Sequence, residues 1–306
     1  MKVIREKDLP INEETVCTIG NFDGFHKGHT FILKLVKETA KKEGKKSLVI
    51  TFDPHPKKIL RPKDAPCRIT NLETKLDLLK DQKIDYVYVI NFDKNFAEKT
   101  PEEFIRFLTC ELKCRKLIVG HDWKFGHMGK GDISTAKEIG KRYKLQVKVI
   151  SPIKIDNERI SSTKIRELLK KGDVYNVSKL LGRTYCIKGK IHRGNQIGKK
   201  IGFPTINIKP PEDLCLKKGV YSGYVSFNGE IYPAVINYGT RPTIDGKDLF
   251  IEAHIIGKSV DISEERQVKI FFKDFIREEK KFRDIDQLKK QIKVDITSAM
   301  KVLEVK

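Results

Sequence analysis

The stretch that decides the fold is Cys17-Thr18-Ile19-Gly20-Asn21-Phe22-Asp23-Gly24-Phe25-His26-Lys27-Gly28-His29. The apolar run at residues 16–19 predicts a buried strand that ends at Gly20. After His29, apolar residues recur at helical spacing as far as Gly44, which is placed to end a helix. The stretch therefore predicts a strand–loop–helix corner. Such a corner can bind anions, because the first amides of a helix are unpaired and its dipole is positive there.

Two histidines in this stretch, His26 and His29, flank a glycine near the predicted start of the helix. Their ring N–H groups can donate hydrogen bonds to phosphate oxygens and to the negative charge that develops on a departing pyrophosphate. A tight turn with two solvated histidines is the structural alternative. The remaining motifs of the chain decide between these two interpretations.

The chain of 306 residues is long enough for two domains, each with its own core. Hydrophobic residues make up 39% and charged residues 34%, which is typical of a globular protein rather than a disordered one. There is no run of 18 apolar residues, and residues 1–7 lack the apolar region of a signal peptide. We therefore expect a cytoplasmic protein with no membrane partner.

The six cysteines are scattered without a Cys-x-x-Cys pair, at positions 17, 67, 110, 114, 186 and 215. Cys110 and Cys114 are spaced by one turn in a segment with a helical pattern. Buried thiols are therefore expected, rather than disulfides or a zinc site.

The formal net charge of +21 suggests a nucleic-acid-binding protein. However, residues 1–182 hold 38 Lys and Arg against 25 Asp and Glu (+13), and residues 183–306 hold 24 against 16 (+8). The excess is spread almost evenly without a basic tail, and a positive field also suits polyphosphate substrates. We therefore do not expect a nucleic-acid partner.

The first half alternates apolar runs with helical patterns. Asn71 precedes one such helix, and Thr100, Pro101 and Glu103 start another with a capping box. This alternation predicts a doubly wound α/β domain with a parallel sheet, whose ligands bind beyond the carboxyl ends of the strands. The expected strands span residues 16–19, 47–52, 86–90, 116–119 and 146–150.

Three further segments of this half follow strands. Residues 51–56 place His55 between two prolines, which predicts a stiff, extended loop. Residues 119–126 carry Asp122 before a glycine-rich loop, although their two aromatic residues can equally belong to the core.

The third segment, residues 160–166, begins a helix that is expected to end near Gly172. Hydroxyl residues at a helix start are commonly only caps. Here Lys164 and Arg166 add positive charge to the free amides, which predicts a second anion-binding site. One site after the first strand and one after the last can hold a triphosphate between them.

Beyond Gly182 the pattern changes to short alternating runs with no long helices between them. Asn228-Gly229, between two of these runs, is a strong hairpin signal. Several such strands predict an antiparallel β-barrel, and residues 285–303 predict a C-terminal helix laid on it. The expected strands span residues 185–191, 219–227, 230–236, 250–256 and 267–272.

The second half also contains Gly194, Gly198 and Gly202, whose backbone amides can wrap phosphate, although their spacing is not that of a Walker motif. They lead into a strand on which Thr205 and Asn207 point to the same side. Two side-chain oxygens so placed suit Mg²⁺, which prefers a few hard oxygen ligands together with phosphate.

The first half resembles the bacterial FAD synthetase module of the His-x-Gly-His nucleotidyltransferases. The matching elements are Gly-Asn-Phe-Asp-Gly-x-His-x-Gly-His, Thr-Phe-x-Pro-His-Pro, Val-Gly-x-Asn/Asp-Phe-x-Phe-Gly (here with Trp123 for the first phenylalanine) and Ser-Ser-Thr-x-Ile-Arg. The resemblance implies a Rossmann-like domain that transfers an adenylyl group from ATP to FMN, with His26, His29 and Arg166 as catalytic residues. It also implies ATP-binding by Gly20, Asn21, Phe22, Asp23, Gly24, Ser161, Ser162 and Thr163, and flavin-binding by Pro54, His55, Pro56 and Asp122.

The second half resembles the flavokinases. The matching elements are Gly-x3-Gly-x3-Gly-x-Pro-Thr-x-Asn, Asn-x-Gly-x-x-Pro-Thr, Glu-x-His and Ile-Arg-x-x-x-x-Phe. The resemblance implies that Glu252 accepts the proton of the ribityl 5′-hydroxyl as it attacks ATP. It also implies flavin-binding by Arg277, metal-binding by Thr205 and Asn207, and phosphate-binding by Gly194, Gly198, Lys199 (where arginine is usual) and Gly202. Between Gly257 and Val268 the match weakens.

Together these resemblances imply a bifunctional enzyme with an adenylyltransferase domain at 1–182 and a riboflavin kinase domain at 183–306. Riboflavin, FMN, FAD and ATP with Mg²⁺ are the expected ligands, and no obligate protein partner is expected. Two alternatives stay open. One is a nucleotidyltransferase with another acceptor, which leaves the barrel unexplained. The other is a non-enzymatic nucleic-acid-binding protein, whose binding would fall steeply with salt.

Overall fold

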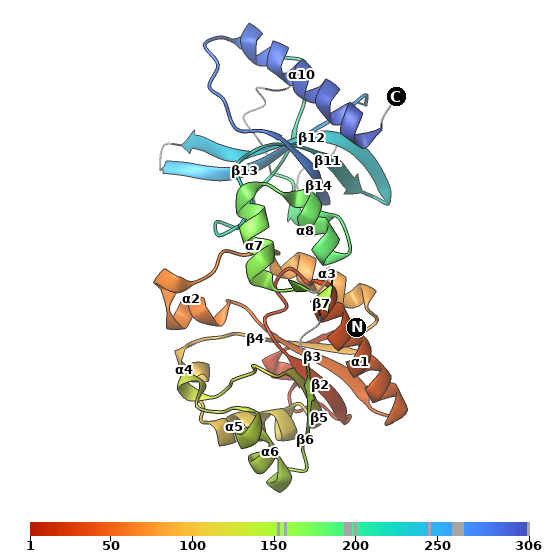
Figure 1. Cartoon of the computed structure of the whole chain (residues 1–306), viewed down its shortest axis with the longest axis vertical. Helices are drawn as coiled ribbons and strands as arrows, with labels where there is room; N and C mark the ends of the chain where they lie inside the picture. Colours follow the sequence, from red (N-terminus) through yellow and green to blue (C-terminus); the bar gives the residue numbers. More distant parts are fainter. Residues whose placement is uncertain are drawn as a thin grey trace. The chain divides into compact units, whose positions relative to one another are not determined.

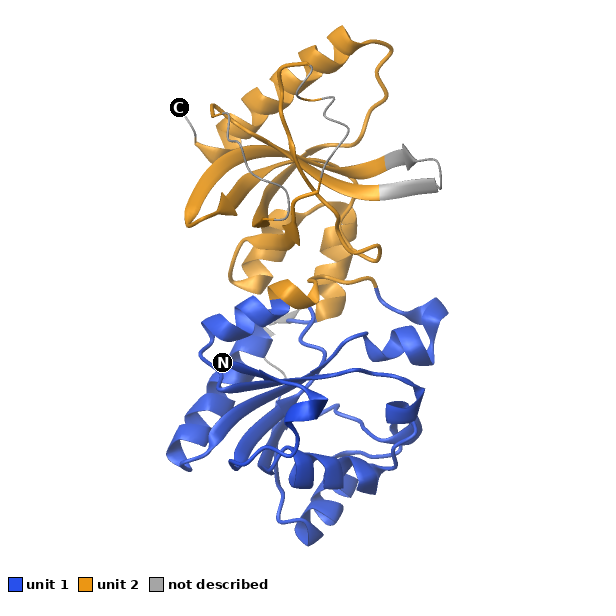
Figure 2. Cartoon of the chain, turned by 180° about the vertical axis from the view of Figure 1, so that it is seen from behind, with its two compact units in different colours: residues 1–66, 75–161 blue, residues 67–74, 162–306 orange. Residues whose placement is uncertain are grey.

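The computed structural model describes residues 1–151, 154–155, 158–192, 198, 201–243, 246–258 and 266–304, and of these it gives only the backbone at 154–155, 158–159, 241–243 and 246–248. The chain divides into two compact units (Figure 2). Unit 1 comprises Met1–Pro66 and Lys75–Ser161, and unit 2 comprises Cys67–Thr74 and Ser162–Lys306. In the described part, no helix is both long and apolar enough to cross a membrane.

Unit 1 is built on a six-stranded parallel sheet in the order β1-β4-β3-β2-β5-β6 (Figure 1). The strands are β1 (Lys2–Ile4), β2 (Thr15–Ile19), β3 (Lys46–Phe52), β4 (Tyr86–Ile90), β5 (Cys114–Gly120) and β6 (Gln146–Ile150). All five expected strands are confirmed. The sixth strand, β1, was not predicted, because it is too short to show a hydrophobic periodicity. Because β2 lies between β3 and β5, the connections after it run in opposite directions along the sheet. Its carboxyl end is therefore the topological switch point, where such sheets bind ligands.

Helices cover both faces of this sheet. The helices are α1 (Lys27–Lys42), α2 (Pro56–Leu60), α3 (Leu72–Asp81, of which unit 1 holds the part from Lys75), α4 (Lys94–Ala97), α5 (Pro101–Arg106) and α6 (Ile133–Arg142). Shorter helical segments span Glu6–Asp8, Pro62–Asp64, Phe107–Glu111 and His127–Gly129. A separate pair of short strands is formed by β7 (Lys154–Ile155) and β8 (Glu158–Arg159). Val16 of β2 packs with Val36 of α1. Its neighbour Cys17 clusters on the other face with Phe104 of α5 and Ala136 of α6. Alternate residues of one strand thus serve two buried faces, which confirms the doubly wound prediction.

Unit 2 is built on a six-stranded antiparallel sheet in the order β10-β13-β12-β11-β14-β9. Its elements are α7 (Ser162–Lys171), α8 (Val174–Leu181), β9 (Tyr185–Lys190), β10 (Ile206–Ile208), β11 (Gly219–Phe227), β12 (Glu230–Thr243), β13 (Gly246–Ile255), β14 (Gln267–Arg277) and α10 (Ile285–Leu303). A bridge between Ile191 and Ile208 joins the end of β9 to β10, so the two edge strands of the sheet meet as the predicted barrel requires. Asn228 and Gly229 have φ values of 51° and 83°, as expected for the β11–β12 hairpin. The predicted C-terminal helix is α10, which packs against β11, β12 and β14.

The helices α7 and α8 and residues 67–74 pack with the barrel. They contribute to its buried core the side chains of Ile69, Ile165, Leu169, Val174, Val177 and Leu181. The compact units therefore divide at Ser161 and not at the expected boundary between residues 182 and 183. The physical reason is that α8 buries its apolar face on β9 and β14, and α7 packs on α8. That the two activities divide at residue 182 remains a prediction.

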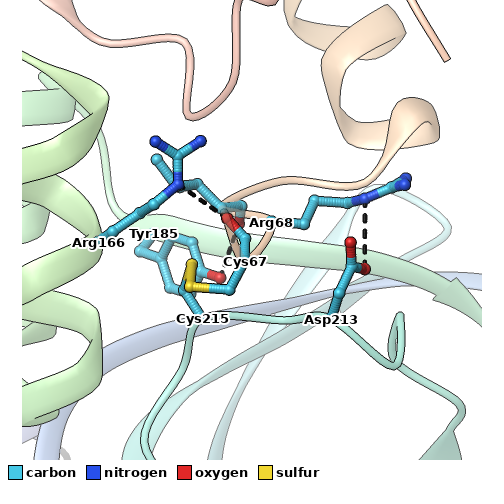
Figure 3. The surroundings of a disulfide bond; sticks show 7 residues. Cys67, Arg68, Arg166, Tyr185, Asp213 and Cys215 are labelled. Atoms are coloured by element: carbon cyan, nitrogen blue, oxygen red, sulfur yellow. Dashed lines mark hydrogen bonds and ion pairs between the residues drawn. A yellow bond between two sulfur atoms is a disulfide. The ribbon is translucent and has the colours of Figure 1, made fainter. Parts of the chain in front are cut away.

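Cys67 and Cys215 form a disulfide with a Cα–Cα distance of 5.0 Å, so the prediction of free thiols was wrong for this pair (Figure 3). The two cysteines are 148 residues apart, and sequence spacing gives no sign of their pairing. They meet because the backbone of Arg68 lies beside Leu214, with its N–H donating to Asp213 O (2.6 Å) and its carbonyl accepting from Cys215 N (2.9 Å).

The other four cysteines are free, as predicted. Cys17, Cys114 and Cys186 are buried, whereas Cys110 is exposed. Cys114 begins β5 instead of continuing a helix, because the helical segment ends at Glu111. The expectation of buried thiols is therefore correct for three of them and wrong for Cys110.

The packing of α7 and α8 predicts how fragments of the chain behave. A fragment of residues 162–306 should melt at least about 10 °C above a fragment of residues 183–306, because the shorter one exposes the barrel surface that five buried aliphatic side chains cover, each worth roughly 1.5–3 kcal/mol. Thermal unfolding followed by circular dichroism measures the difference. Equal melting temperatures would show that the two helices are dispensable for the barrel.

Candidate active sites

The loop between β2 and α1 lies at the switch point of the parallel sheet and contains the stretch from Gly20 to His26. Phe22, Gly24 and Phe25 have φ values of 46°, 82° and 48°. Left-handed backbone at a bulky residue is strained and persists only where the surroundings hold it. Both phenylalanine rings are 3% exposed, in a cluster with Leu33 of α1, so the core holds the loop in this conformation.

His26 and His29 stack on each other with ring centroids 3.7 Å apart. α1 begins at Lys27, two residues earlier than the pattern after His29 suggested, so His29 lies in its first turn. His26 is the N-cap, and its Nδ1 accepts a hydrogen bond from the backbone N–H of His29 at 3.3 Å. An accepting Nδ1 leaves the proton of the neutral ring on Nε2, where it can donate to a ligand.

Both histidines are neutral near pH 7. Burial lowers the pKa of His26 to about 4, against an opposing effect of the nearby Asp23 carboxylate. Burial lowers the pKa of His29 well below its ordinary value, and the charges of His26 and Lys75 lower it further. The rings can therefore act as hydrogen-bond donors, while they add no net charge to the site.

Two polar atoms at the β2–α1 corner, one in the loop and one in the first turn of α1, are buried and have no hydrogen-bond partner among the residues that the structure describes. They are Oδ1 of Asn21 and Nδ1 of His29. Buried polar atoms are nearly always hydrogen-bonded, and exceptions mark places where a ligand or water completes the set. The predicted ATP-binding stretch from Gly20 to Gly24 thus has the chemistry of a binding loop rather than of a simple turn.

The remaining residues predicted for this site lie on two other loops of unit 1. The loop at 51–56 is not extended to its end, because Pro56 is the first residue of α2 and His55 caps that helix by accepting from Lys57 N at 3.2 Å. Asp122 is exposed and lines a surface hollow of about 200 Å³ together with Trp123 and Asp132. Trp123 stacks on the buried Phe125 at 4.4 Å, which supports the interpretation of this aromatic pair as core.

The second predicted anion site begins α7. Ser162 and Thr163 form the first turn, and Ser161 precedes them. Arg166 donates from Nε to the carbonyl of Cys67 at 2.8 Å, and this contact anchors it beside the disulfide (Figure 3). Arg166 belongs to unit 2 and the two histidines to unit 1, so their joint action remains a proposal.

Unit 2 contains a cavity of about 350 Å³ that brings together four of the residues predicted for the kinase site: Gly198, Thr205, Glu252 and Arg277. Gly198 comes from a loop, Thr205 immediately precedes β10, Glu252 lies in the middle of β13 and Arg277 ends β14. The other lining residues are Ile201, Phe203, Val220, Val235, Asn237, His254, Glu279, Lys280, Phe282, Leu288, Ile292 and Asp295. The mixture of apolar walls and a few convergent polar groups is typical of a small-molecule site.

Strand register sets a row of three polar residues, of which Glu252 and Asn237 line the cavity. Glu252 of β13 lies opposite Asn207 of β10 on one side and opposite Asn237 of β12 on the other. Directly opposed residues point to the same face of a sheet. The register thus places one carboxylate between two amides, of which Asn207 is buried and donates from Nδ2 to the carbonyl of Thr205 at 3.3 Å.

The glycine-rich loop before β10 is described only in part. Gly198 lies in the described residues, and a Cβ there would collide with the carbonyl oxygen of Phe203, so no other residue fits. Gly202 has a φ of 90° and is exposed. The predicted phosphate-binding residues Gly194 and Lys199 lie outside the described residues.

The donor set beside Glu252 fits a hard cation. Thr205, immediately before β10, offers a hydroxyl, and Asn207 within β10 offers an amide oxygen. The carboxylate of Glu252 belongs to the residue in register with Asn207. Oxygen ligands of this kind, together with substrate phosphates and water, are what Mg²⁺ prefers.

Arg277 is held in a bidentate ion pair. Its Nε and Nη2 donate to the two carboxylate oxygens of Asp295 at 2.8 and 2.7 Å, and Nη1 donates to the carbonyl of Glu278 at 2.9 Å. Asp295 lies on α10, is 3% exposed and also accepts from Gln291 Nε2 at 2.9 Å. Arg277 therefore forms a fixed wall of the cavity and ties α10 to β14.

Sequence reasoning missed Asp295 as part of this cavity. A signal existed, because Asp295 falls on the apolar face of the helix that Ile292, Ile296 and Ala299 define. A carboxylate on a buried helix face needs a partner, and the sequence alone does not say which arginine supplies it.

Comparisons with known proteins match both halves of the chain. The family model for FAD synthetase matches residues 8–164, and the family model for riboflavin kinase matches residues 181–303. Together with the parallel-sheet corner and the barrel cavity, these matches define the class of protein, an enzyme of the transferase class with two catalytic modules.

Relatives along the whole chain identify the family. The bifunctional riboflavin kinase/FMN adenylyltransferase of Buchnera aphidicola subsp. Schizaphis graminum is 35% identical over 303 residues, which cover 97% of each chain. The protein of the same name from Haemophilus influenzae is 37% identical over 284 residues, or 92% of each chain. The chain belongs to the bifunctional riboflavin kinase/FMN adenylyltransferase family.

A solved structure shares the fold over nearly the full length. It is titled a macrolide-efflux protein from Streptococcus pneumoniae, and it is similar to this chain with a TM-score of 0.80 and 30% identity, covering 97% of this chain and 98% of its own. The efflux activity in that title belongs to that protein. The two family models that match this chain describe FAD synthetase and riboflavin kinase, and neither describes efflux.

The depressed pKa of His26 predicts an acid-sensitive unit 1. Because the folded pKa lies near 4 and the unfolded one near 6.5, the neutral ring contributes stability fully above pH 6.5, and this contribution is lost as the pH falls toward 4. His26→Asn keeps an N-cap acceptor without a titrating ring, so its stability should fall less over that range. Urea unfolding followed by the fluorescence of Trp123, the single tryptophan, reports on unit 1. Identical pH dependence in the two proteins would contradict this account.

Proposed function

We propose that the chain makes FAD in two ATP-dependent steps, with phosphorylation of riboflavin to FMN at the unit 2 cavity and adenylylation of FMN at the β2–α1 corner of unit 1. The observation that carries the kinase assignment is the cavity that gathers Gly198, Thr205, Glu252 and Arg277. The observation that carries the second step is the strained corner, with its two neutral histidines and two buried polar atoms that have no partner in the described part of the chain.

In the kinase step Glu252 accepts the proton of the ribityl 5′-hydroxyl as that oxygen attacks the γ-phosphorus of ATP. A new P–O bond forms to the ribityl oxygen, and the bond to ADP breaks. Asn207 and Asn237 lie opposite Glu252 on the two neighbouring strands. Thr205 and Asn207 would hold Mg²⁺, which neutralises charge on the phosphates. Arg277 forms the flavin-binding wall. The backbone amides of Gly194, Gly198 and Gly202 bind phosphate, and Lys199 is a further phosphate-binding residue.

In the adenylyl step an oxygen of the FMN phosphate attacks the α-phosphorus of ATP, and the bond to pyrophosphate breaks. His26 and His29 donate hydrogen bonds to the charge that develops on the departing pyrophosphate. Ser161, Ser162, Thr163 and Arg166 bind the phosphates from the start of α7. The flavin lies near the loop at 54–56 and near Asp122. No covalent nucleophile is needed, since positioning and charge stabilisation suffice.

The remaining expectations stay proposals of the same kind. We infer a cytoplasmic enzyme whose ligands are riboflavin, FMN, FAD and ATP, and which needs no nucleic acid, membrane or obligate protein partner. The names of the relatives support riboflavin and FMN as two of these ligands.

Glu252→Gln tests the kinase base. The amide keeps the size of the side chain but cannot accept the proton, so FMN formation should fall by ~10²–10⁴-fold while riboflavin affinity hardly changes. Turnover is measured by chromatography of the flavins, and Glu212→Gln, at an exposed position of unit 2, is the matched control. Normal kinase turnover in Glu252→Gln would remove this residue from the mechanism.

Thr205→Val separates metal binding from proton transfer. The variant loses a hydroxyl that we assign to Mg²⁺, so its defect should include weaker ATP–Mg²⁺ binding that added Mg²⁺ partly restores. The dependence of FMN formation on Mg²⁺ concentration measures this. A Mg²⁺ optimum identical to that of the unmodified protein would argue against Thr205 as a ligand.

His29→Ala tests the adenylyl site. Loss of one positioned donor should lower FAD formation from supplied FMN by on the order of 10²-fold, while FMN formation from riboflavin stays near normal. Lys42→Ala, at an exposed position in the last turn of the same helix, is the control and should keep both activities. Equal loss of both activities in His29→Ala would mean that the histidine is structural.

A further inference from the structure

A lysine that the reaction scheme leaves without a role lies beside the β2–α1 corner. Lys75 is on α3 and only 7% exposed, although lysine is almost never fully buried unless it is paired. In sequence it falls between Leu72 and Leu79 on the apolar face of that helix. Taking an ammonium group out of water is energetically costly, so a lysine at such a position calls for an explanation.

A chain of hydrogen bonds joins Lys75 to the binding loop. Its Nζ donates to the hydroxyl of Thr51 at 3.2 Å, and this hydroxyl donates to the backbone carbonyl of Asn21 at 3.2 Å. Thr51 lies at the carboxyl end of β3 and is fully buried. The carbonyl of Asn21 is thereby fixed immediately before the left-handed residue Phe22.

The ammonium group also acts on the histidines. Its charge is close enough to His29 to help lower the pKa of that ring, after burial and the charge of His26. Because both histidines are neutral near pH 7, they offer donors without charge, whereas Lys75 brings a full positive charge to the same corner. The negative charge that develops on a departing pyrophosphate is stabilised both by hydrogen-bond donors and by a nearby positive charge.

We propose that Lys75 is a positioning residue for adenylyl transfer, which holds Asn21 and the strained loop through Thr51 and sets a positive field at His29 for the polyphosphate of ATP. This inference rests on the proposed adenylyl transfer in unit 1. Lys75 acts through Thr51 and His29.

Lys75→Met tests the inference, because methionine has a similar length and no charge. The turnover number for FAD formation from FMN should fall by ~10²-fold, as a small misplacement at a reacting centre typically causes, while the KM for FMN changes less than about threefold. Lys80→Met, an exposed lysine on the same helix, is the matched control and should behave as the unmodified protein. FMN formation from riboflavin is measured in the same preparations and should be unchanged.

Thr51→Val supplies a second, independent variant, since it keeps the branched shape and breaks both hydrogen bonds of the chain. We expect a loss of about tenfold in FAD turnover. The FAD turnover of the double variant Lys75→Met/Thr51→Val should be at most about threefold lower than that of Lys75→Met. The reason is that the effects of two residues that act through one chain of hydrogen bonds are not additive.

Three results would overturn the inference: FAD turnover in Lys75→Met within threefold of normal, an equal fall in FMN formation, or losses that multiply in the double variant. The first shows no role, the second a general structural role, and the third two independent roles. If the unmodified protein and Lys80→Met make no FAD from FMN, the proposed function itself fails, and that outcome is distinct from these three.

Discussion

The corner between β2 and α1 is the constraint on which unit 1 depends. The chain passes from a buried strand into a helix through Phe22, Gly24 and Phe25, all in left-handed backbone. Two phenylalanines tolerate that conformation because their rings are buried in the core. The same turn leaves buried polar atoms of Asn21 and His29 without partners in the described part of the chain. Strain held by packing, together with unsatisfied polar atoms at a switch point, indicates a binding loop rather than a structural turn.

In unit 2 the strand register, rather than a strained loop, positions the polar side chains of the candidate site. Asn207, Glu252 and Asn237 oppose one another on three neighbouring strands. A slip of one residue would turn a strand's side chains to the other face, so the cavity exists only in this register. The tight Asn228-Gly229 turn fixes the β11–β12 pairing, and the ion pair of Arg277 with Asp295 fixes α10 over the cavity. The two candidate sites are therefore held by different interactions, a strained and buried loop in unit 1 and strand register in unit 2.

Local periodicity was enough to predict most strands, the doubly wound sheet, the hairpin and the C-terminal helix, because each depends on neighbouring residues. The packing of α7 and α8 on the barrel was not predictable, since an apolar helix face does not say which sheet covers it. The Cys67–Cys215 disulfide depends on a contact between distant segments in the same way. Motif residues that are adjacent in sequence could be predicted as site residues from the sequence, and those assignments remain predictions. Asp295 and Lys75 were singled out only in the tertiary structure, although each stands out as a charge on an apolar helix face.

The central claim is that two chemically different attacks on ATP occur in one chain, one at the γ-phosphorus and one at the α-phosphorus. Phosphorus-31 NMR of the protein with ATP, Mg²⁺ and either riboflavin or FMN tests this most directly, because the two attacks release different products. With FMN as the only flavin, the account predicts pyrophosphate in step with FAD and no ADP; with riboflavin it predicts ADP first and pyrophosphate later. Release of ADP in step with FAD when FMN is supplied, or consumption of ATP to neither product, would contradict it.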